Sequence, residues 1–248
     1  MGIFILVLLY ILTSQFIRLT SRDSRRRRRR LVKNTSRFSR MALALLRIRV
    51  VVRRGGLLAR NRAARLIVAN HVSSADILIL SSIAPCVFVT SVELGNAFFV
   101  GMMARCGGSI FVERRRVTGL KKEIEEIEGA IKDGLDVTLF PEGTTSDGDA
   151  VRPFKNSLFD AAIKSGADVL PICIRYKSVN GRKIDSSNRD SIYFYGGMSF
   201  FAHALRLLSN NEVEVDVLVL APVKTADRYS RKDLAAVCHK EICSAYSS

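Results

Sequence analysis

The sequence predicts an α/β fold: a mixed, mostly parallel sheet flanked by helices, with an N-terminal membrane-associated helical segment. From about residue 64 onward, short apolar runs alternate with segments of helical spacing, a pattern typical of helices packed on parallel strands. The first 40 or so residues differ from the rest in composition. We therefore expect a membrane anchor with a polybasic stretch at 1–40 and one globular domain at 41–248.

The N-terminal segment is apolar first and basic afterwards. Residues 1–17 carry no charged side chain, whereas Arg25 to Arg30 are six consecutive arginines. A cleaved signal peptide has its positive charge before the apolar stretch, so this order argues against one. The apolar run of about 16 residues is near the lower limit, roughly 17–25, for a membrane-spanning helix. We expect attachment to the cytoplasmic face of a membrane, by spanning it or by lying in its interface.

The globular part contains predicted elements in a regular order. Residues 41–52 are expected to form the first element of this part, as a helix or a strand. Strands are expected at 66–69, 86–90, 109–112, 135–140, 169–176, 192–195 and 212–220. Helices are expected at 76–83, 96–105, 120–131 and 157–164. Pro171 has no backbone N–H, so 169–176 is an expected edge strand. The alternating 212–220 segment indicates a half-exposed strand and mixed pairing.

The charge balance restricts the kinds of partner. Lys and Arg number 39 against 23 Asp and Glu, which gives a formal charge of +16. An anionic bilayer surface, nucleic acid or a phosphorylated substrate could each supply the opposite charge. Nucleic-acid binding gives no reason for the apolar leader, so we expect membrane lipids and no nucleic acid. The five cysteines include no C-x-x-C pair, which argues against a disulfide framework and a zinc site.

A histidine and a carboxylate follow the first expected strand of the domain. Asn70 and His71 end an apolar run, and Asp76 comes five residues after the histidine. One interpretation is a turn and a helix start, with Ser73 as the N-cap and Asp76 in the first turn. The other is chemical, because a carboxylate bonded to one imidazole nitrogen makes the second nitrogen a better base. These residues alone leave both interpretations open.

Two further segments follow apolar strands. Phe140 to Gly148 has the sequence FPEGTTSDG, in which Glu142 stands directly behind a strand where an unpartnered carboxylate would be costly. The alternative is an ordinary turn, since Gly, Thr, Ser and Asp are turn residues. Arg114 follows the expected strand 109–112. Its guanidinium could bind a phosphate or carboxylate, or simply be solvated.

Together these segments resemble the lysophospholipid and glycerol-phosphate acyltransferases, the family of bacterial 1-acyl-glycerol-3-phosphate acyltransferase. Asn70-His71 with Asp76 matches the motif N-H-x4-D, and Gly108 to Arg114 resembles G-x-x-F-[IV]-x-R. Phe140 to Ser146 resembles F-P-E-G-T-R-S, and Val169 to Ile172 resembles V-P-[VI]. The four motifs occur in the family's order across about residues 65–220.

The resemblance implies acyl transfer from a thioester of coenzyme A or acyl-carrier protein to the free hydroxyl of a lysolipid, with no cofactor and no metal. His71 would be the general base, oriented by Asp76. The substrate-binding residues would be Arg114, Glu142, Gly143, Thr144, Thr145 and Ser146.

One position departs from the family pattern. Thr145 stands where the third motif usually has arginine, a residue expected to help hold the acceptor phosphate. Arg114, Arg115, Arg152 or Lys155 could offset its loss. We expect 1-acyl-glycerol-3-phosphate as acceptor, giving phosphatidic acid. The alternative is lyso-ornithine lipid, because FPEGTTSDG followed by PFKNSLFDAA resembles the branch that includes lyso-ornithine lipid acyltransferases.

Two other classes of protein compete with this interpretation. A serine hydrolase needs a G-x-S-x-G elbow, and the nearest string, Gly107 to Phe111, lacks the last glycine. A non-enzymatic membrane or nucleic-acid-binding basic protein would explain the charge but not the Phe140 to Gly148 motif.

Overall fold

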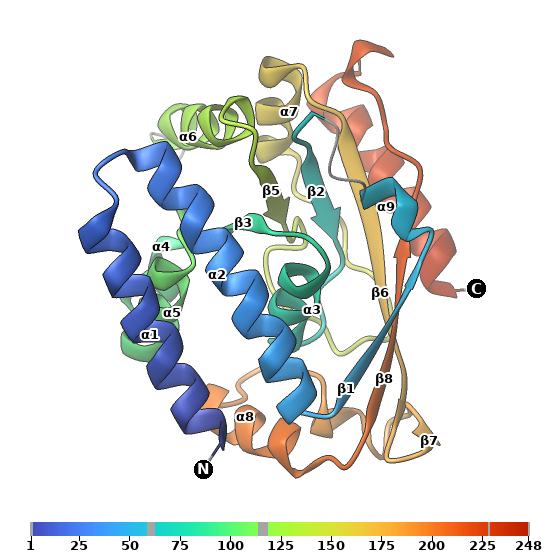
Figure 1. Ribbon diagram of the computed structural model, residues 1–248. Helices are drawn as coiled ribbons and strands as arrows, with labels where there is room; N and C mark the ends of the chain where they lie inside the picture. Colours follow the sequence, from blue (N-terminus) through green and yellow to red (C-terminus); the bar gives the residue numbers. More distant parts are fainter. Residues whose placement is uncertain (1, 59–62, 114–118, 228, 248) are drawn as a thin grey trace.

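The computed structural model describes residues 2–58, 63–113, 119–227 and 229–247 (Figure 1). Its strands are β1 (Ile48–Arg53), β2 (Leu66–Ala69), β3 (Cys86–Ser91), β4 (Ile110–Val112), β5 (Asp136–Leu139), β6 (Val169–Val179), β7 (Arg182–Lys183) and β8 (Val213–Val219). They form one sheet in the order β1-β8-β6-β2-β5-β3-β4, with β7 paired to β6. Only the β6–β8 and β6–β7 pairs of these strands are antiparallel, which confirms the mixed, mostly parallel sheet.

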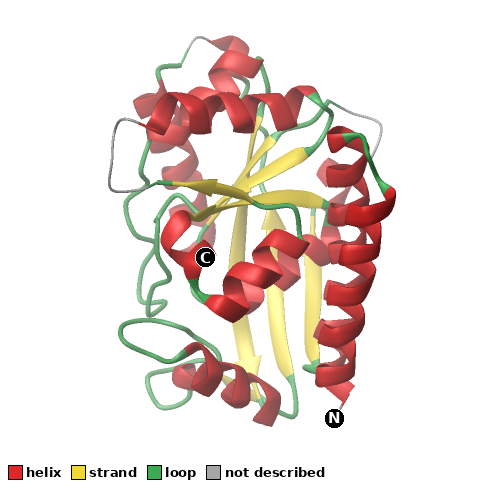
Figure 2. Cartoon of the chain, turned by 90° about the vertical axis from the view of Figure 1, so that its left-hand side faces the viewer, coloured by secondary structure: helices red, strands yellow, loops and turns green. Residues whose placement is uncertain are grey.

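Helices cover both faces of the sheet (Figure 2). They are α1 (Gly2–Thr20), α2 (Ser24–Leu45), α3 (Ala75–Ile83), α4 (Val92–Asn96), α5 (Phe98–Cys106), α6 (Leu120–Lys132), α7 (Asp160–Ser165), α8 (Phe200–Ser209) and α9 (Arg231–Ser247). Leu66 and Val68 of β2 pack toward α6, α7 and α9. Ile67 and Ala69 pack toward α2, α3 and α8. Because β2 is buried on both faces, its sequence is continuously apolar rather than alternating.

The first two helices form an antiparallel pair along one side of the domain (Figure 1). Tyr10 and Thr35 share a hydrogen bond of 2.9 Å between their hydroxyls, and the Asn34 amide donates to the Thr13 hydroxyl at 3.0 Å. Within the described chain, α1 is the one helix long and apolar enough to cross a membrane by length and composition. Residue 40 lies inside α2, and the division into 1–40 and 41–248 stays a prediction.

Two strand predictions are wrong. The 169–176 segment is not at an edge, since β6 lies between β8 and β2. Pro171 fits there because it lies near the start of β6, where its carbonyl accepts from Leu220 and regular pairing with β8 begins only at Ile172. Residues 192–195 form a buried or half-buried loop, not a strand. This loop is fixed by a hydrogen bond from the Phe194 N–H to the Val72 carbonyl.

Candidate active site

Two of the predicted motifs meet because of the sheet topology. β2 and β5 are parallel neighbours, so the loops that follow them leave the same edge of the sheet. His71 lies in the first loop, and Phe140 to Ser146 lie in the second. The Ser146 N–H donates to the His71 carbonyl at 2.9 Å, which ties the two loops together.

His71 and Asp76 form a hydrogen-bonded pair. His71 Nδ1 lies 2.8 Å from Asp76 Oδ2, and the same oxygen accepts the backbone N–H groups of Val72 at 2.8 Å and Ser73 at 2.9 Å. The Asp76 side chain is fully buried, whereas the His71 side chain is 15% exposed. An ionised carboxylate can only accept, so Nδ1 carries the proton and the Nε2 lone pair is left for a substrate. The residues that the structure describes place no hydrogen-bond partner on Nε2.

The second oxygen of Asp76 has its own donor. The Tyr176 hydroxyl, on β6, donates to Asp76 Oδ1 at 2.7 Å. Tyr176 is buried, and burial raises its pKa well above the ordinary value, so its hydroxyl keeps its proton. Sequence analysis missed Tyr176, because it lies 100 residues from Asp76 and only the pairing of β6 with β2 brings the two side chains together.

The imidazole ring is also held by aromatic packing. Phe140 stacks on His71 with ring centroids 3.9 Å apart and planes 12° from parallel. Phe88 stacks behind Phe140 at 6.1 Å. Phe140 therefore fixes the plane of the imidazole while Asp76 fixes its direction.

Asn70 ties the histidine loop to β6. Its amide donates to the Ile174 carbonyl at 3.0 Å, and its carbonyl oxygen accepts the Ile174 N–H at 2.8 Å. The side chain thus continues the β2–β6 pairing by one residue after β2 has ended, and it points into the fold rather than toward a ligand.

Glu142 binds the backbone on both sides of the site. Its Oε1 accepts the His71 N–H at 2.6 Å, and its Oε2 accepts the Arg152 N–H at 2.9 Å. Burial raises the pKa of Glu142 to about 7, against the opposite effect of these two hydrogen bonds. Gly143 follows with φ of 79°, and a Cβ there would lie 2.9 Å from Lys155 Nζ. The carboxylate is used inside the protein, where it supports the backbone of His71.

The other predicted binding residues differ in exposure. Thr144 is exposed, Thr145 is half-buried and Ser146 is buried. Arg114 and Arg115 lie outside the described residues. The acceptor-binding roles of these residues stay predictions.

The helix that carries Asp76 has a different N-cap from the one expected. Ser74 rather than Ser73 is the N-cap of α3, so that part of the prediction is wrong. The Ser73 hydroxyl donates instead to the Ile192 carbonyl at 2.7 Å. The Ser74 hydroxyl lies 3.0 Å from Nε2 of His203, which places α8 directly beside the start of α3.

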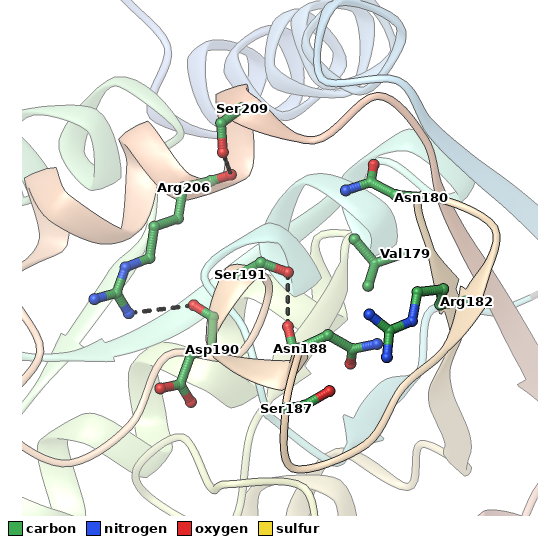
Figure 3. Close-up of a pocket in the computed structure, with 9 residues that line it drawn as sticks. All are labelled: Val179, Asn180, Arg182, Ser187, Asn188, Asp190, Ser191, Arg206 and Ser209. Atoms are coloured by element: carbon green, nitrogen blue, oxygen red, sulfur yellow. Dashed lines mark hydrogen bonds between the residues drawn. The ribbon is translucent and has the colours of Figure 1, made fainter.

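A polar pocket of about 380 Å³ lies near the end of β6 and beside α8 (Figure 3). Its lining residues are Val179, Asn180, Arg182, Ser187, Asn188, Asp190, Ser191, Arg206 and Ser209. Several polar groups there already bond to one another, as Arg206 does to the Asp190 carbonyl and Ser191 to the Asn188 carbonyl. Neither His71 nor Asp76 lines this pocket, so the geometry of the His71–Asp76 pair alone identifies the candidate site. No group of His, Cys, Asp or Glu that could hold a metal occurs among the described residues.

The chain is similar to several known proteins. The model of the acyltransferase family matches residues 50–175. A lyso-ornithine lipid O-acyltransferase of Rhizobium meliloti is 35% identical over 83% of this chain and 72% of that protein. A 1-acyl-sn-glycerol-3-phosphate acyltransferase of Neisseria gonorrhoeae is 32% identical over 68% of this chain and 65% of that protein. The crystal structure of the 1-acyl-sn-glycerophosphate acyltransferase of Thermotoga maritima is similar with a TM-score of 0.71, 22% identity and coverage of 98% of this chain and 91% of that one.

Proposed function

Because the chain belongs to the acyltransferase family, we propose that it is a lyso-ornithine lipid O-acyltransferase with His71 as its general base. The observation that carries the chemistry is the buried Asp76 carboxylate on Nδ1 of a partly exposed imidazole. The sequence alone favoured 1-acyl-glycerol-3-phosphate as acceptor. The similarity to lyso-ornithine lipid acyltransferases supports the alternative more strongly.

The reaction needs only a base and an activated acyl group. The acceptor hydroxyl oxygen attacks the thioester carbonyl carbon while His71 Nε2 takes the hydroxyl proton. The tetrahedral intermediate collapses, the carbon–sulfur bond breaks, and the thiolate leaves with the proton that the imidazolium returns. An ester and a free thiol of coenzyme A or acyl-carrier protein are the products. Asp76 holds Nδ1–H throughout and stabilises the transient imidazolium.

The chemistry of the third motif favours an acceptor without a phosphate. The loop after β5 offers Thr144, Thr145 and Ser146 followed by Asp147, all neutral or acidic. A phosphate monoester would be bound best by arginine, which grips two oxygens at once. An ornithine headgroup carries an amine, whose N–H groups can donate hydrogen bonds to hydroxyl and carboxylate oxygens. The second candidate acceptor is 1-acyl-glycerol-3-phosphate, for which the exposed Arg152 and Lys155 beside the loop could supply positive charge.

Acceptor competition tests the proposal. The full chain in vesicles is offered a labelled acyl thioester with lyso-ornithine lipid and, separately, with lysophosphatidic acid. We expect transfer to lyso-ornithine lipid to dominate. Thr145→Arg should shift the ratio of kcat/KM values toward lysophosphatidic acid by about tenfold, since one charge-assisted hydrogen bond contributes roughly 1.5 kcal/mol. Ala236→Arg, at an exposed position of α9 outside the loop after β5, is the control. Wild-type preference for lysophosphatidic acid would contradict the proposed acceptor.

The exposed apolar side chains support membrane attachment. On α1 they are Phe4, Ile5, Leu8, Leu9, Leu12, Phe16 and Leu19. Phe98 of α5 is 90% exposed, and Phe201 and Leu205 of α8 are also exposed. We refer to all these side chains as the apolar surface. α1 contacts α5, and Phe99 of α5 packs on Phe200 and Phe201 of α8, so the surface is continuous through these helices. Since α8 lies beside the start of α3, the apolar surface reaches the neighbourhood of His71.

We propose that α1 lies in the interface of the bilayer and does not cross it. Contacts between α1 and α2 run from Gly2 against Leu45 to Thr20 against Arg30, so α2 accompanies α1 over its whole length. A spanning α1 would draw the arginines of α2 into the hydrocarbon, at roughly 2.5–3.5 kcal/mol for each at the centre. An interfacial α1 buries its apolar face and leaves the arginines near anionic headgroups on the cytoplasmic side.

A further inference from the structure

We infer that Tyr176 is a positioning residue of the acyl-transfer reaction, acting through Asp76. The inference rests on the proposed role of His71 as the base. Its basis is the hydrogen bond of 2.7 Å from the Tyr176 hydroxyl to Asp76 Oδ1, the carboxylate oxygen that His71 does not use.

The two carboxylate oxygens of Asp76 are supported in different ways. Oδ2 accepts hydrogen bonds from the imidazole and from two backbone N–H groups, and these N–H groups belong to the same loop as His71 itself. Oδ1 accepts a hydrogen bond from the hydroxyl of Tyr176, which lies on a central strand of the sheet. Rotation of the carboxylate about its Cβ–Cγ bond moves both oxygens together, so the Tyr176 bond to Oδ1 also resists displacement of Oδ2, to which the imidazole is bonded. Tyr176 therefore fixes the plane of the carboxylate relative to the sheet, and with it the direction of the Nδ1–H bond.

The phenol is well suited to this task. Tyr176 is buried, and its ring packs edge-on against Tyr193 with centroids 5.7 Å apart. Because its position is fixed by packing and its hydroxyl keeps its proton, the donor is in place before a substrate arrives. A preorganised donor of this kind costs no rearrangement during the reaction.

Several other ionisable groups face Asp76. They are His71 from its own loop, Glu142 after β5, His203 on α8, Tyr193 before α8 and Tyr246 on α9. Of these groups and Tyr176, only His71 and Tyr176 share a hydrogen bond with the Asp76 carboxylate in the described part of the chain. Removing the Tyr176 hydroxyl thus changes the carboxylate directly and leaves the remaining groups in place.

Tyr176→Phe tests the inference, because it deletes one oxygen and keeps the ring. We expect kcat to fall by about tenfold with KM nearly unchanged, as for the loss of one hydrogen bond to a charged group. With one donor fewer, the carboxylate attracts a proton on the imidazole more strongly. The acidic limb of the kcat/KM profile should therefore move to higher pH, which a merely structural defect would not cause.

Tyr193→Phe is the matched control, since it deletes the hydroxyl of the neighbouring buried ring, which makes no hydrogen bond to Asp76 in the described structure. It should leave kcat and the pH profile as in the wild type. Wild-type kcat and an unmoved acidic limb in Tyr176→Phe would overturn the inference. His71→Ala separates the two claims: an inactive His71→Ala beside an unaffected Tyr176→Phe refutes only the role of Tyr176, whereas an active His71→Ala refutes the proposed function itself.

Discussion

At the scale of single residues, two buried carboxylates support the same histidine in different ways. Asp76 binds the imidazole and directs its proton. Glu142 binds the backbone N–H of His71 and connects it to the segment around Arg152. The first acts on the imidazole ring, and the second on the loop that carries it. Local sequence predicted both residues as functional, but only the structure separates their roles.

The raised pKa of Glu142 predicts a pH-dependent stability. The folded carboxyl has a pKa of about 7 against 4.5 in its ordinary state, so the folded chain binds the proton more tightly. The stabilisation is fully present below pH 4.5 and is lost as pH rises toward 7 and above. Glu142→Gln cannot titrate, and it should remove this part of the pH dependence while losing one of the two backbone hydrogen bonds, because an amide has a single acceptor oxygen.

Urea unfolding of the full chain in detergent at pH 5 and pH 8 measures the effect. The loss of unfolding free energy between the two pH values should be smaller in Glu142→Gln than in the wild type. Glu125→Gln, the same change at an exposed position of α6, is the control and should keep the wild-type difference. An identical pH dependence in all three proteins would refute the prediction.

At the scale of elements, α2 presents a row of cations. Exposed basic side chains recur at helical spacing along one face of α2, at Arg26, Arg29, Lys33, Arg37 and Arg40, and Arg22 lies just before the helix. The other sides of α2 carry its buried residues, such as Val32 and Leu43, and the contacts with α1. Arg29 also donates to the Asp133 carbonyl at 2.9 Å, and the other cations of the row can meet anionic headgroups when the apolar surface is in the bilayer.

Neutralising this row should weaken binding to anionic membranes. The variant Arg26→Gln, Lys33→Gln, Arg37→Gln, Arg40→Gln should lose at least about tenfold in affinity for vesicles with anionic lipid, since each charge near such a surface contributes roughly 1 kcal/mol. Binding to neutral vesicles should change little. The control neutralises four exposed cations of β7 and α9, which lie on the opposite side of the domain (Figure 1): Arg182, Lys183, Lys232 and Lys240. Equal losses in both variants would contradict a specific role for α2.

At the scale of the whole molecule, sequence predicted the alternation of strands and helices because their periodicity is local. The prediction failed where contacts between residues far apart in the sequence decide the local structure. Pro171 indicated an edge strand, but β6 is central because pairing with β8 begins one residue later. The 192–195 segment has β-forming residues, yet it is held as a loop by Val72 and Ser73. Tyr176 belongs to no local motif, and only the sheet brings it to Asp76.

At this scale, the candidate active site and the apolar surface are connected through α3 and α8. His71 lies in the loop after β2, α3 starts beside it, and α8 connects that start to the aromatic contacts of α5. A lysolipid whose chain remains in the bilayer could then offer its hydroxyl to His71 without leaving the membrane. The dependence of acyl transfer on His71 is the central claim of this account.

The most direct test is acyl transfer to lyso-ornithine lipid by the full chain in anionic vesicles, comparing the wild type with His71→Ala. His239→Ala is the control, because His239 lies on α9 against Phe154 and shares no hydrogen bond with His71 or Asp76 in the described structure. We predict that His71→Ala loses about 10²–10⁴-fold in rate, as expected for a general base, while His239→Ala keeps the wild-type rate. Wild-type transfer by a folded His71→Ala protein would contradict the account.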